Sequence, residues 1–500
     1  LNNFVKPGGQ QKARGVGTLA APGQPQPAFT FNDSSGSVEH ALVPGDFAVL
    51  YNVGPLHTAG INGTNQTIAI VGRSDVNMQD VQNFRNDFGV APTTNLPNVI
   101  HNGPDPGDIG GGDEGESDLD LQWGGAIAPS ATIDFVVSAT TDTTDGIDLS
   151  AEYIVDNNLA PVMSTSYAGC EQGLGQAENQ FISSLYEQAA AQGITVIDSS
   201  GDSGAAGCDP NDGSEQSSTG GLAVSGLAST PFNVAVGGTQ FNEGSGTFWN
   251  ATNDSTTGAS VTGPIPEVAW NESCTNKNCD TGAPFSSTGG GASAIYTKPS
   301  WQQAPGVPGD GARDVPDISF SAAGHDGYVV CDSGSGGGGS GFPTGCQLQP
   351  GQGGGKQFGF LVFGGTSAST PSFAGVMALV NQKTASIQGQ ADFTLYSLAR
   401  SNENFGSCNA STGSPSSTCI FLDTTVGNNS VPCSAGTGCN GSVLTGFAAG
   451  AGYDQVTGLG SINVTNLVNS WASATPSLAT TTTLTLTPTS LAHGQAVTIT

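Results

Sequence analysis

Ser367 stands in a stretch whose residue types suit a nucleophile, the sequence GGTSASTPSFAG at 364–375. The apolar run at 357–363 predicts a buried strand before it, and residues 375–381 predict a helix after it. The N–H groups at a helix start can stabilise negative charge, and the two glycines would let a substrate backbone approach. The alternative is a serine that only caps the helix. A catalytic serine also needs a base and an oxyanion donor.

Two carboxylates in the sequence GESDLDLQW at 115–123 are candidates for the base. Glu116 and Asp120 are four residues apart, so a helix would place both on one face, where like charges repel and one acid holds a proton. A carboxylate takes a proton from serine efficiently only in acid, where its pKa of about 4 is close to the working pH. Asp118 falls on another face and is expected to take no part. The alternative is an acidic helix start that complements the helix dipole.

A third acid, Asp202, follows the predicted strand at 194–198 in the sequence SSGDSG at 199–204. Active sites of parallel sheets collect at the carboxyl ends of strands. A protonated Asp202 could donate a hydrogen bond to an oxyanion, which a carboxylate cannot do. The alternative is an Asx turn, which is common for aspartate between glycine and serine.

A histidine base would instead indicate a subtilisin-type enzyme, and the chain has five histidines: His40, His57, His101, His325 and His493. None stands in a His-Gly-Thr sequence that opens a helix. We therefore expect surface or loop roles for all five.

Strands and helices alternate along the part of the chain that must position these side chains. The predicted strands lie at 67–71, 132–137, 161–164 and 194–198, and the predicted helices at 75–84, 117–128, 146–157 and 174–192. This alternation predicts an α/β fold with a parallel sheet and helices on both faces. From about 240 to 355 the chain is rich in Gly, Ser, Asn and Pro, which indicates long loops and hairpins.

The composition limits the partners of this protein. Its 500 residues include 11 Lys plus Arg against 41 Asp plus Glu, a formal net charge of −30. Nucleic acid and anionic membrane surfaces are therefore poor partners, and an acidic medium, in which carboxylates protonate, suits the chain. Acidity that merely aids solubility is the alternative. No membrane span or signal peptide is visible, and the chain opens on Leu1, so we expect a processed, secreted product.

Ten cysteines fall in close-spaced pairs along the chain. The pairs are Cys170 and Cys208, Cys274 and Cys279, Cys331 and Cys346, Cys408 and Cys419, and Cys433 and Cys439. An even count in Gly- and Ser-rich loops predicts disulfides and an oxidising compartment, and pairing in sequence order is the simplest connectivity. Zinc binding is disfavoured, because no Cys-x-x-Cys repeats and no histidine lies beside these pairs.

Three of these motifs together resemble the sedolisin family, the serine-carboxyl peptidases that include kumamolisin. They are GTSASTP at 365–371, the Glu116-x-x-x-Asp120 pair and SSGD at 199–202. The resemblance covers roughly residues 41–472. It implies a subtilisin-like fold with Ser367 as nucleophile, Glu116 as general base, Asp120 orienting Glu116, and Asp202 in the oxyanion hole. We further expect a monomer without membrane insertion, which acts on proteins or peptides and is inhibited by its own propeptide.

The family also has a calcium site late in its catalytic domain, and LDT at 422–424 with GAGYDQVTGLG at 450–460 is similar to it. The resemblance implies that the carboxylates of Asp423 and Asp454 and the carbonyls of Thr424, Gly450 and Gly452 bind Ca²⁺, which prefers such hard oxygen ligands. Thr424 stands where isoleucine is common in the family, and a carbonyl ligand tolerates that change. An ordinary turn at Asp454 is the alternative.

Two positions depart from the kumamolisin-like pattern. Those members carry a glutamate just after the strand that matches 67–71, where this chain has Gly72-Arg73-Ser74. They also carry a tryptophan where this chain has Tyr167. Both changes concern the wider proton network and the pH optimum, and leave the central residues in place.

We therefore expect three parts in the chain. Residues 1–40 are a leader or the remnant of a propeptide, 41–472 a sedolisin-like peptidase domain, and 473–500 a linker with the truncated start of an Ig-like β module. The expected function is that of a secreted, acid-acting endopeptidase that works through an acyl-enzyme. The alternatives are a tripeptidyl-peptidase of the same family, a subtilisin-type enzyme and a non-catalytic secreted adhesin.

Overall fold

A computed structural model gives the fold of most of the chain. It describes residues 8–9, 12–20, 30–32, 38–211, 217–273, 285–334, 344–347, 349–350, 356–402, 404–412, 415–474, 486–487 and 498–499.

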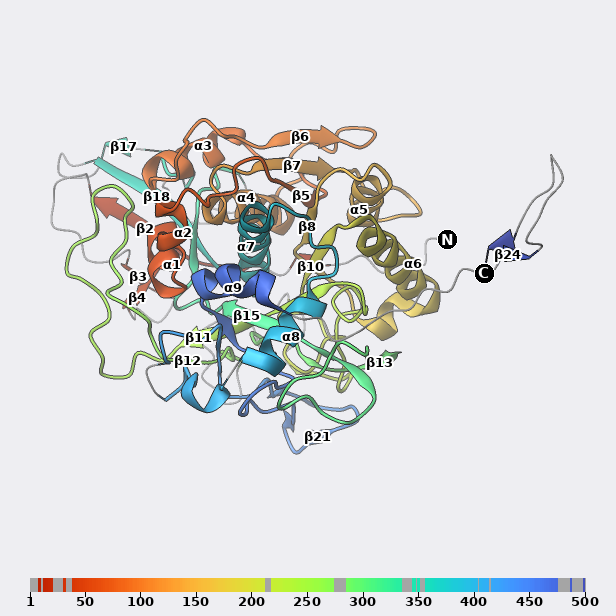
Figure 1. Ribbon diagram of the computed structural model, residues 1–500. Coiled ribbons are helices and arrows are strands. Elements are labelled where there is room, and N and C mark those ends of the chain that lie inside the picture. Colours follow the sequence, from red (N-terminus) through yellow and green to blue (C-terminus); the bar gives the residue numbers. More distant parts are fainter. Residues whose placement is uncertain are drawn as a thin grey trace.

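The described residues build an eight-stranded sheet through the middle of the protein (Figure 1). In spatial order its strands are β12 (Glu267–Ala269), β11 (Val234–Phe241), β10 (Thr195–Ser199), β8 (Val162–Thr165), β5 (Thr67–Gly72), β7 (Thr132–Val137) and β6 (Asn98–His101), with β15 (Ile318–Ser321) also paired to β11. All pairs are parallel except β11 with β12. The central strands β8 and β10 are buried along their whole length, as strands covered on both faces must be. The predicted α/β fold with a mostly parallel sheet is confirmed.

Helices cover both faces of this sheet (Figure 1). On one face α4 (Gly111–Ile127) and α7 (Thr366–Thr384) pack beside each other, and on the other face lie α5 (Gly146–Asp156) and α6 (Glu171–Gln192). The remaining helices are α1 (Pro44–Leu50), α2 (Gly54–Thr58), α3 (Met78–Asp87), α8 (Asp392–Asn402) and α9 (Val464–Ser470). The larger apolar core lies on the side of α4 and α7.

Helix α7 begins at Thr366, well before the start near 375 that the sequence predicts. Residues 366–374 are mostly small or hydroxyl-bearing, which locally favours caps and turns, but this part of α7 is wholly buried. Tertiary packing therefore overrides the local preference. Gly375 permits the close contact of α7 with α4, because a Cβ there would lie 2.6 Å from the Cβ of Ile127.

Short antiparallel sheets surround this framework. Their strands are β1 (Gly8–Gly9) with β9 (Tyr167–Ala168), β3 (Thr30–Asn32) with β4 (Val38–His40), β13 (Gly291–Thr297) with β14 (Ala312–Val315), β19 (Phe421–Leu422) with β23 (Ser461–Ile462), β24 (Leu486–Thr487) with β25 (Thr498–Ile499), and β20 (Val431–Pro432) and β21 (Cys439–Asn440) on either side of β22 (Val443–Leu444). The described residues between 240 and 350 lie largely in loops and short strands, as the composition indicates.

The N-terminal segment takes part in one further sheet. In it β18 (Lys356–Gly364) pairs with β16 (Tyr328–Val330), β17 (Gln349–Pro350) and β2 (Lys12–Ala20). Strand β2 runs antiparallel to residues 357–364 of β18, which leads directly into α7. Part of the expected leader is thus a strand beside β18, which immediately precedes the helix that carries Ser367.

The predicted sequential disulfide pairing is confirmed for the cysteines that the structure describes. The bonds join Cys170 to Cys208, Cys331 to Cys346, Cys408 to Cys419, and Cys433 to Cys439. Cys274 and Cys279 lie outside the described residues. Within the described part of the chain, every helix is too short or too polar to cross a membrane.

Candidate active site

Ser367 and Glu116, 251 residues apart in the chain, meet where α7 packs against α4. The Ser367 hydroxyl donates to Glu116 Oε2 over 3.1 Å. Both side chains are completely buried, so water does not screen their interaction. A carboxylate in this position can take the hydroxyl proton as the serine oxygen attacks a carbonyl carbon.

Ser166 joins this pair, although the sequence analysis did not select it. It follows β8, and its hydroxyl donates to Asp120 Oδ1 over 2.7 Å, while its carbonyl oxygen lies 3.2 Å from the Ser367 hydroxyl. Pro371 has no N–H to bond the carbonyl of Ser367, and the Ser166 hydroxyl lies 3.5 Å from that oxygen. A run of polar residues directly after a buried strand is the signal that could have identified Ser166.

Asp120 lies one helical turn after Glu116 on α4, as the spacing predicts. Burial raises the pKa of Asp120 well above its usual range, and the hydrogen bond from Ser166 lowers it in part. A protonated Asp120 relieves the like-charge repulsion between the two acids. Asp118 bonds a different residue from those that Glu116 and Asp120 bond: its Oδ1 accepts a hydrogen bond from the Gln122 amide over 3.0 Å.

Asp202 lies just beyond β10, next to the residue that precedes Ser367. Its Oδ1 accepts from the backbone N–H of Thr366 over 2.8 Å and from the Thr366 hydroxyl over 2.9 Å. The N–H of Gly201 in turn donates to the Thr366 hydroxyl over 3.2 Å. These bonds join the carboxyl end of β10 to the N-terminus of α7. Hydrogen-bond donors of a helix start and a carboxyl group therefore gather beside Ser367, where an oxyanion could be bound.

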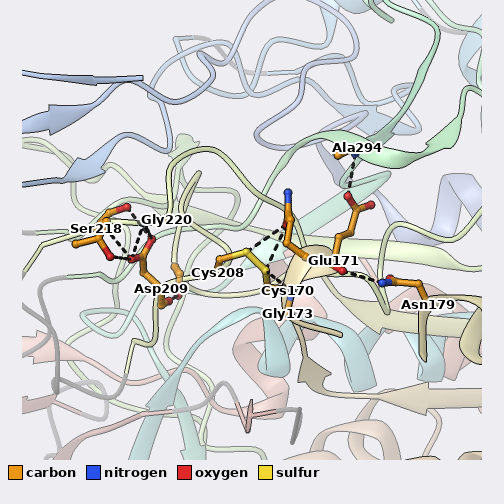
Figure 2. Close-up of a disulfide and its surroundings, with 12 residues drawn as sticks. Cys170, Glu171, Gly173, Asn179, Cys208, Asp209, Ser218, Gly220 and Ala294 are labelled. Carbon is orange, nitrogen blue, oxygen red and sulfur yellow. Dashed lines mark hydrogen bonds between the residues drawn. A yellow bond between two sulfur atoms is a disulfide. The ribbon is translucent and has the colours of Figure 1, made fainter. Parts of the chain in front are cut away.

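A cavity of about 530 Å³ opens beside Asp202, and the Cys170–Cys208 disulfide forms part of its wall. Figure 2 shows how that wall is supported on both sides. Glu171 accepts from the N–H of Ala294 over 2.8 Å, and Asp209 accepts from the Ser218 hydroxyl over 2.7 Å. The cavity is large enough for an amino-acid side chain.

The edge of the site pairs with an extended segment of the same chain. Strand β1 runs antiparallel to β9, with Gly8 opposite Ala168 and Gly9 opposite Tyr167. Strand β9 directly follows Ser166. The backbone at this edge therefore accepts an added strand, which is a common way to bind peptides.

The described histidines have partners away from Ser367. His40 stacks on Trp249, His57 Nε2 lies 2.9 Å from the Ile127 carbonyl, His101 Nε2 lies 2.8 Å from Asp75, and His325 lies between Glu272 and Asp326. His493 lies outside the described residues. Among the described residues, the titratable side chain that accepts a hydrogen bond from the Ser367 hydroxyl is that of Glu116.

The predicted metal ligands Asp423 and Asp454 are brought to one loop. The N–H of Gly452 lies 3.2 Å from both oxygens of Asp423, and the N–H of Gly450 donates to Asp454 Oδ2 over 2.9 Å. Burial raises the pKa of Asp423 to about 7, with a contribution from the nearby Asp454, and burial raises the pKa of Asp454 to about 6. Two buried, mutually repelling carboxylates fit a hard cation. Thr424, also predicted as a ligand, is buried next to Asp423.

The two unusual positions Arg73 and Tyr167 contact each other. The guanidinium carbon of Arg73 lies 4.9 Å from the centre of the Tyr167 ring, and Arg73 forms ion pairs with Asp113 at 2.8 Å and Asp145 at 3.1 Å. Tyr167 follows Ser166, and the charges of Glu116 and Asp120 act on its hydroxyl, so this buried cation–π pair adjoins the candidate site.

The fold and the site define a class: subtilisin-like α/β proteins in which a serine is paired with carboxylates. No family model matches the sequence. The chain is 28% identical to sedolisin of Pseudomonas sp. (strain 101) over 85% of its length and 60% of that protein. It is 28% identical to kumamolisin of Bacillus sp. (strain MN-32) over 86% of its length and 63% of that protein. Tripeptidyl-peptidase 1 of Dictyostelium discoideum is 27% identical over 81% of this chain and 54% of that protein.

A solved structure is similar to this chain as well. Pseudomonas sedolisin, a serine-carboxyl proteinase complexed with two molecules of pseudo-iodotyrostatin, superposes with a TM-score of 0.63 at 25% identity, covering 87% of this chain and 99% of that chain. The chain is thus a relative of the sedolisin family over most of its length. It spans about three fifths of the length of the first two curated relatives.

Proposed function

We propose that this protein is a secreted, acid-acting serine-carboxyl endopeptidase. The observation that carries the proposal is the 3.1 Å hydrogen bond from the Ser367 hydroxyl to Glu116 inside a buried site. The relationship to sedolisin and kumamolisin supports it. The disulfides support an oxidising compartment outside the cytosol.

In the proposed mechanism, Ser367 Oγ attacks the carbonyl carbon of the scissile peptide bond while Glu116 takes its proton. The tetrahedral intermediate expels the amine, which receives that proton from Glu116, and an ester remains on Ser367. Water then attacks the ester with Glu116 again as base, releasing the carboxylic acid and restoring the hydroxyl of Ser367.

The neighbouring acids have supporting roles. Asp120, held by Ser166, keeps Glu116 in its orientation. Because Oδ1 of Asp202 accepts from Thr366, a proton on the other oxygen of Asp202 would be the one donated to the oxyanion. Such a donor contributes about 10²–10³-fold to the rate in comparable sites.

The pairing of β1 with β9 supports a substrate-binding mode. We expect a substrate to run along β9 as an added strand, with one side chain in the cavity beside Asp202. Residues of the N-terminal segment occupy that edge in this structure, which supports inhibition by a propeptide of which 1–40 is a part.

Hydrolysis of an unfolded protein substrate between pH 3 and 8 tests the proposed function. We expect activity confined to acid, since Asp202 can donate a hydrogen bond to the oxyanion only while it is protonated, and a carboxylate base works best where its pKa is close to the working pH. Initial rates measured across this pH range would show the optimum. Activity that peaks near neutral pH would favour a histidine base, and binding without cleavage at any pH would favour the adhesin alternative.

A tripeptidyl-peptidase is a second candidate, because curated tripeptidyl-peptidases also match the chain. Peptides with free and acetylated N-termini separate the two activities. An endopeptidase cleaves both, whereas a tripeptidyl-peptidase releases tripeptides only from the free form.

We further propose that Asp423 and Asp454, with carbonyls of Thr424, Gly450 and Gly452, bind Ca²⁺. The two carboxylates would supply charge and the carbonyls neutral oxygen ligands, and the bound ion would hold together the segments around 423 and 450–454. The proposal is supported by the position of both buried acids beside the backbone of one loop.

Removal of calcium should therefore destabilise the protein. We expect a chelator at pH 6 to lower the Tm by about 3 °C, because a ligand at about 100 times its Kd contributes about 2.7 kcal/mol and a domain of this length has a large unfolding entropy. The effect should be smaller at pH 4, where protons compete for the carboxylates. Thermal unfolding with and without chelator measures this change.

Two variants control the calcium experiment. Asp454→Asn should respond less to the chelator, and Asp142→Asn, which changes an exposed aspartate, should respond like the unaltered chain. A Tm that is indifferent to the chelator would contradict the calcium proposal.

A further inference from the structure

Three buried aspartates from separate elements converge outside the candidate active site. Asp80 lies on α3, Asp118 on α4, and Asp332 follows β16. Each offers one carboxylate oxygen, and these oxygens all lie within 4.8 Å of one another. All three residues are 0% exposed. Only the fold brings them together, since they are far apart in sequence.

Hydrogen bonds hold one oxygen of each carboxylate. Asp80 Oδ2 accepts from the N–H and hydroxyl of Ser333 over 2.8 and 2.6 Å, and Asp332 Oδ1 accepts from the N–H of Gly334 over 2.8 Å. Asp118 is held by Gln122, as described above. The remaining oxygens, Asp80 Oδ1, Asp118 Oδ2 and Asp332 Oδ2, are buried and have no hydrogen-bond partner among the residues that the structure describes. Buried polar atoms without a protein partner are expected to bind a ligand.

No positive charge balances this cluster within the described residues. None of the three aspartates forms an ion pair with lysine or arginine there. The carboxyl groups of Glu114 and Asp108 add to the negative potential. Burying an unpaired ion is strongly unfavourable, so the folded state needs either protons or a cation at this point.

The distances between the three carboxyl groups suit a bound cation better than protons shared between them. Two carboxyl groups that share a proton lie at hydrogen-bond distance, but none of the three aspartates bonds to another. Oxygen ligands at about 2.4 Å from a Ca²⁺ ion are separated by up to about 4.8 Å. Space is kept at the site by Gly345, where a Cβ would lie 2.3 Å from Asp80 Oδ1.

We propose that Asp80, Asp118 and Asp332 form a second binding site for a divalent cation with hard oxygen ligands, of which Ca²⁺ is the best fit. The ion would fasten the segment of the Cys331–Cys346 disulfide to α4, the helix that carries Glu116 and Asp120. Gln122 already links the same parts, because its amide donates to Asp118 and to the Cys331 carbonyl over 2.7 Å.

Calcium titration of the full chain tests this site without relying on peptidase activity. The protein is first freed of metal by dialysis against a chelator and then titrated calorimetrically with CaCl₂ at pH 7, where the carboxylates can ionise. We expect two ions per chain, one ion in Asp118→Asn and one ion in Asp454→Asn. The exposed control Asp142→Asn should keep two.

The variants separate this inference from the proposed site at Asp423 and Asp454. A chain that binds one ion, lost in Asp118→Asn and kept in Asp454→Asn, would still support the cluster. Equal stoichiometry in Asp118→Asn and the unaltered chain, or no calcium bound by Asp454→Asn, would overturn it. If Asp118→Asn fails to fold, as judged by near-ultraviolet circular dichroism, Asp332→Asn and the Asp454→Asn result decide the question.

Discussion

Replacing Ser367 by alanine is expected to reduce kcat for peptide hydrolysis by about 10⁴-fold or more, the largest effect of any single change. The substitution removes the oxygen that donates to Glu116 and that is the nucleophile in the proposed mechanism. It removes one small buried atom and keeps a good helix former at that position, so α7 should keep its fold. Initial rates with a fluorogenic peptide at the acid optimum measure this loss.

A neighbouring serine provides the matched control. Ser372 is also buried on α7, but among the described residues its hydroxyl bonds only the Ala368 carbonyl of the same helix, over 2.9 Å. Ser372→Ala should therefore keep most of the activity. If Ser367→Ala retained more than about one hundredth of the rate, the nucleophile would have to be another residue.

Replacing Glu116 by glutamine should lower kcat by about 10²–10⁴-fold and change KM little. Glutamine has nearly the same size and can still bond the Ser367 hydroxyl, but it cannot take the proton when Ser367 attacks. The loss should persist across the acid range, because no change of pH restores a base at this position. Steady-state kinetics from pH 3 to 6 would show both features.

Two comparisons make the glutamine result specific. Glu116→Asp keeps the acid but shortens the side chain, so we expect partial activity with the acid optimum preserved. An unchanged Tm would exclude a general loss of fold in Glu116→Gln. Near-normal turnover by Glu116→Gln would contradict the proposed role of Glu116 and with it the serine-carboxyl mechanism.

Much of the fold could be predicted from the sequence, because short-range patterns of residues determine its strands and helices. Alternating apolar strands and amphipathic helices predict the parallel sheet, and the strands at 67–72, 132–137 and 195–199 lie within a residue of their predicted positions. The disulfides could also be predicted, because the cysteines of each described pair are at most 38 residues apart. The serine and the carboxylic acids of the candidate site could be selected from the sequence because they stand at predicted strand ends and helix starts.

The partners of these residues depended on packing between distant segments. Ser166 becomes part of the site only because β8 ends beside α7, and the early start of α7 at Thr366 comes from burial against the sheet rather than from local propensity. The contact of Arg73 with Tyr167 and the meeting of Asp80, Asp118 and Asp332 have the same origin. Periodicity along a chain reports which face of an element is buried, but it does not report what the other elements place against that face, and that is why these contacts appear only in the folded protein.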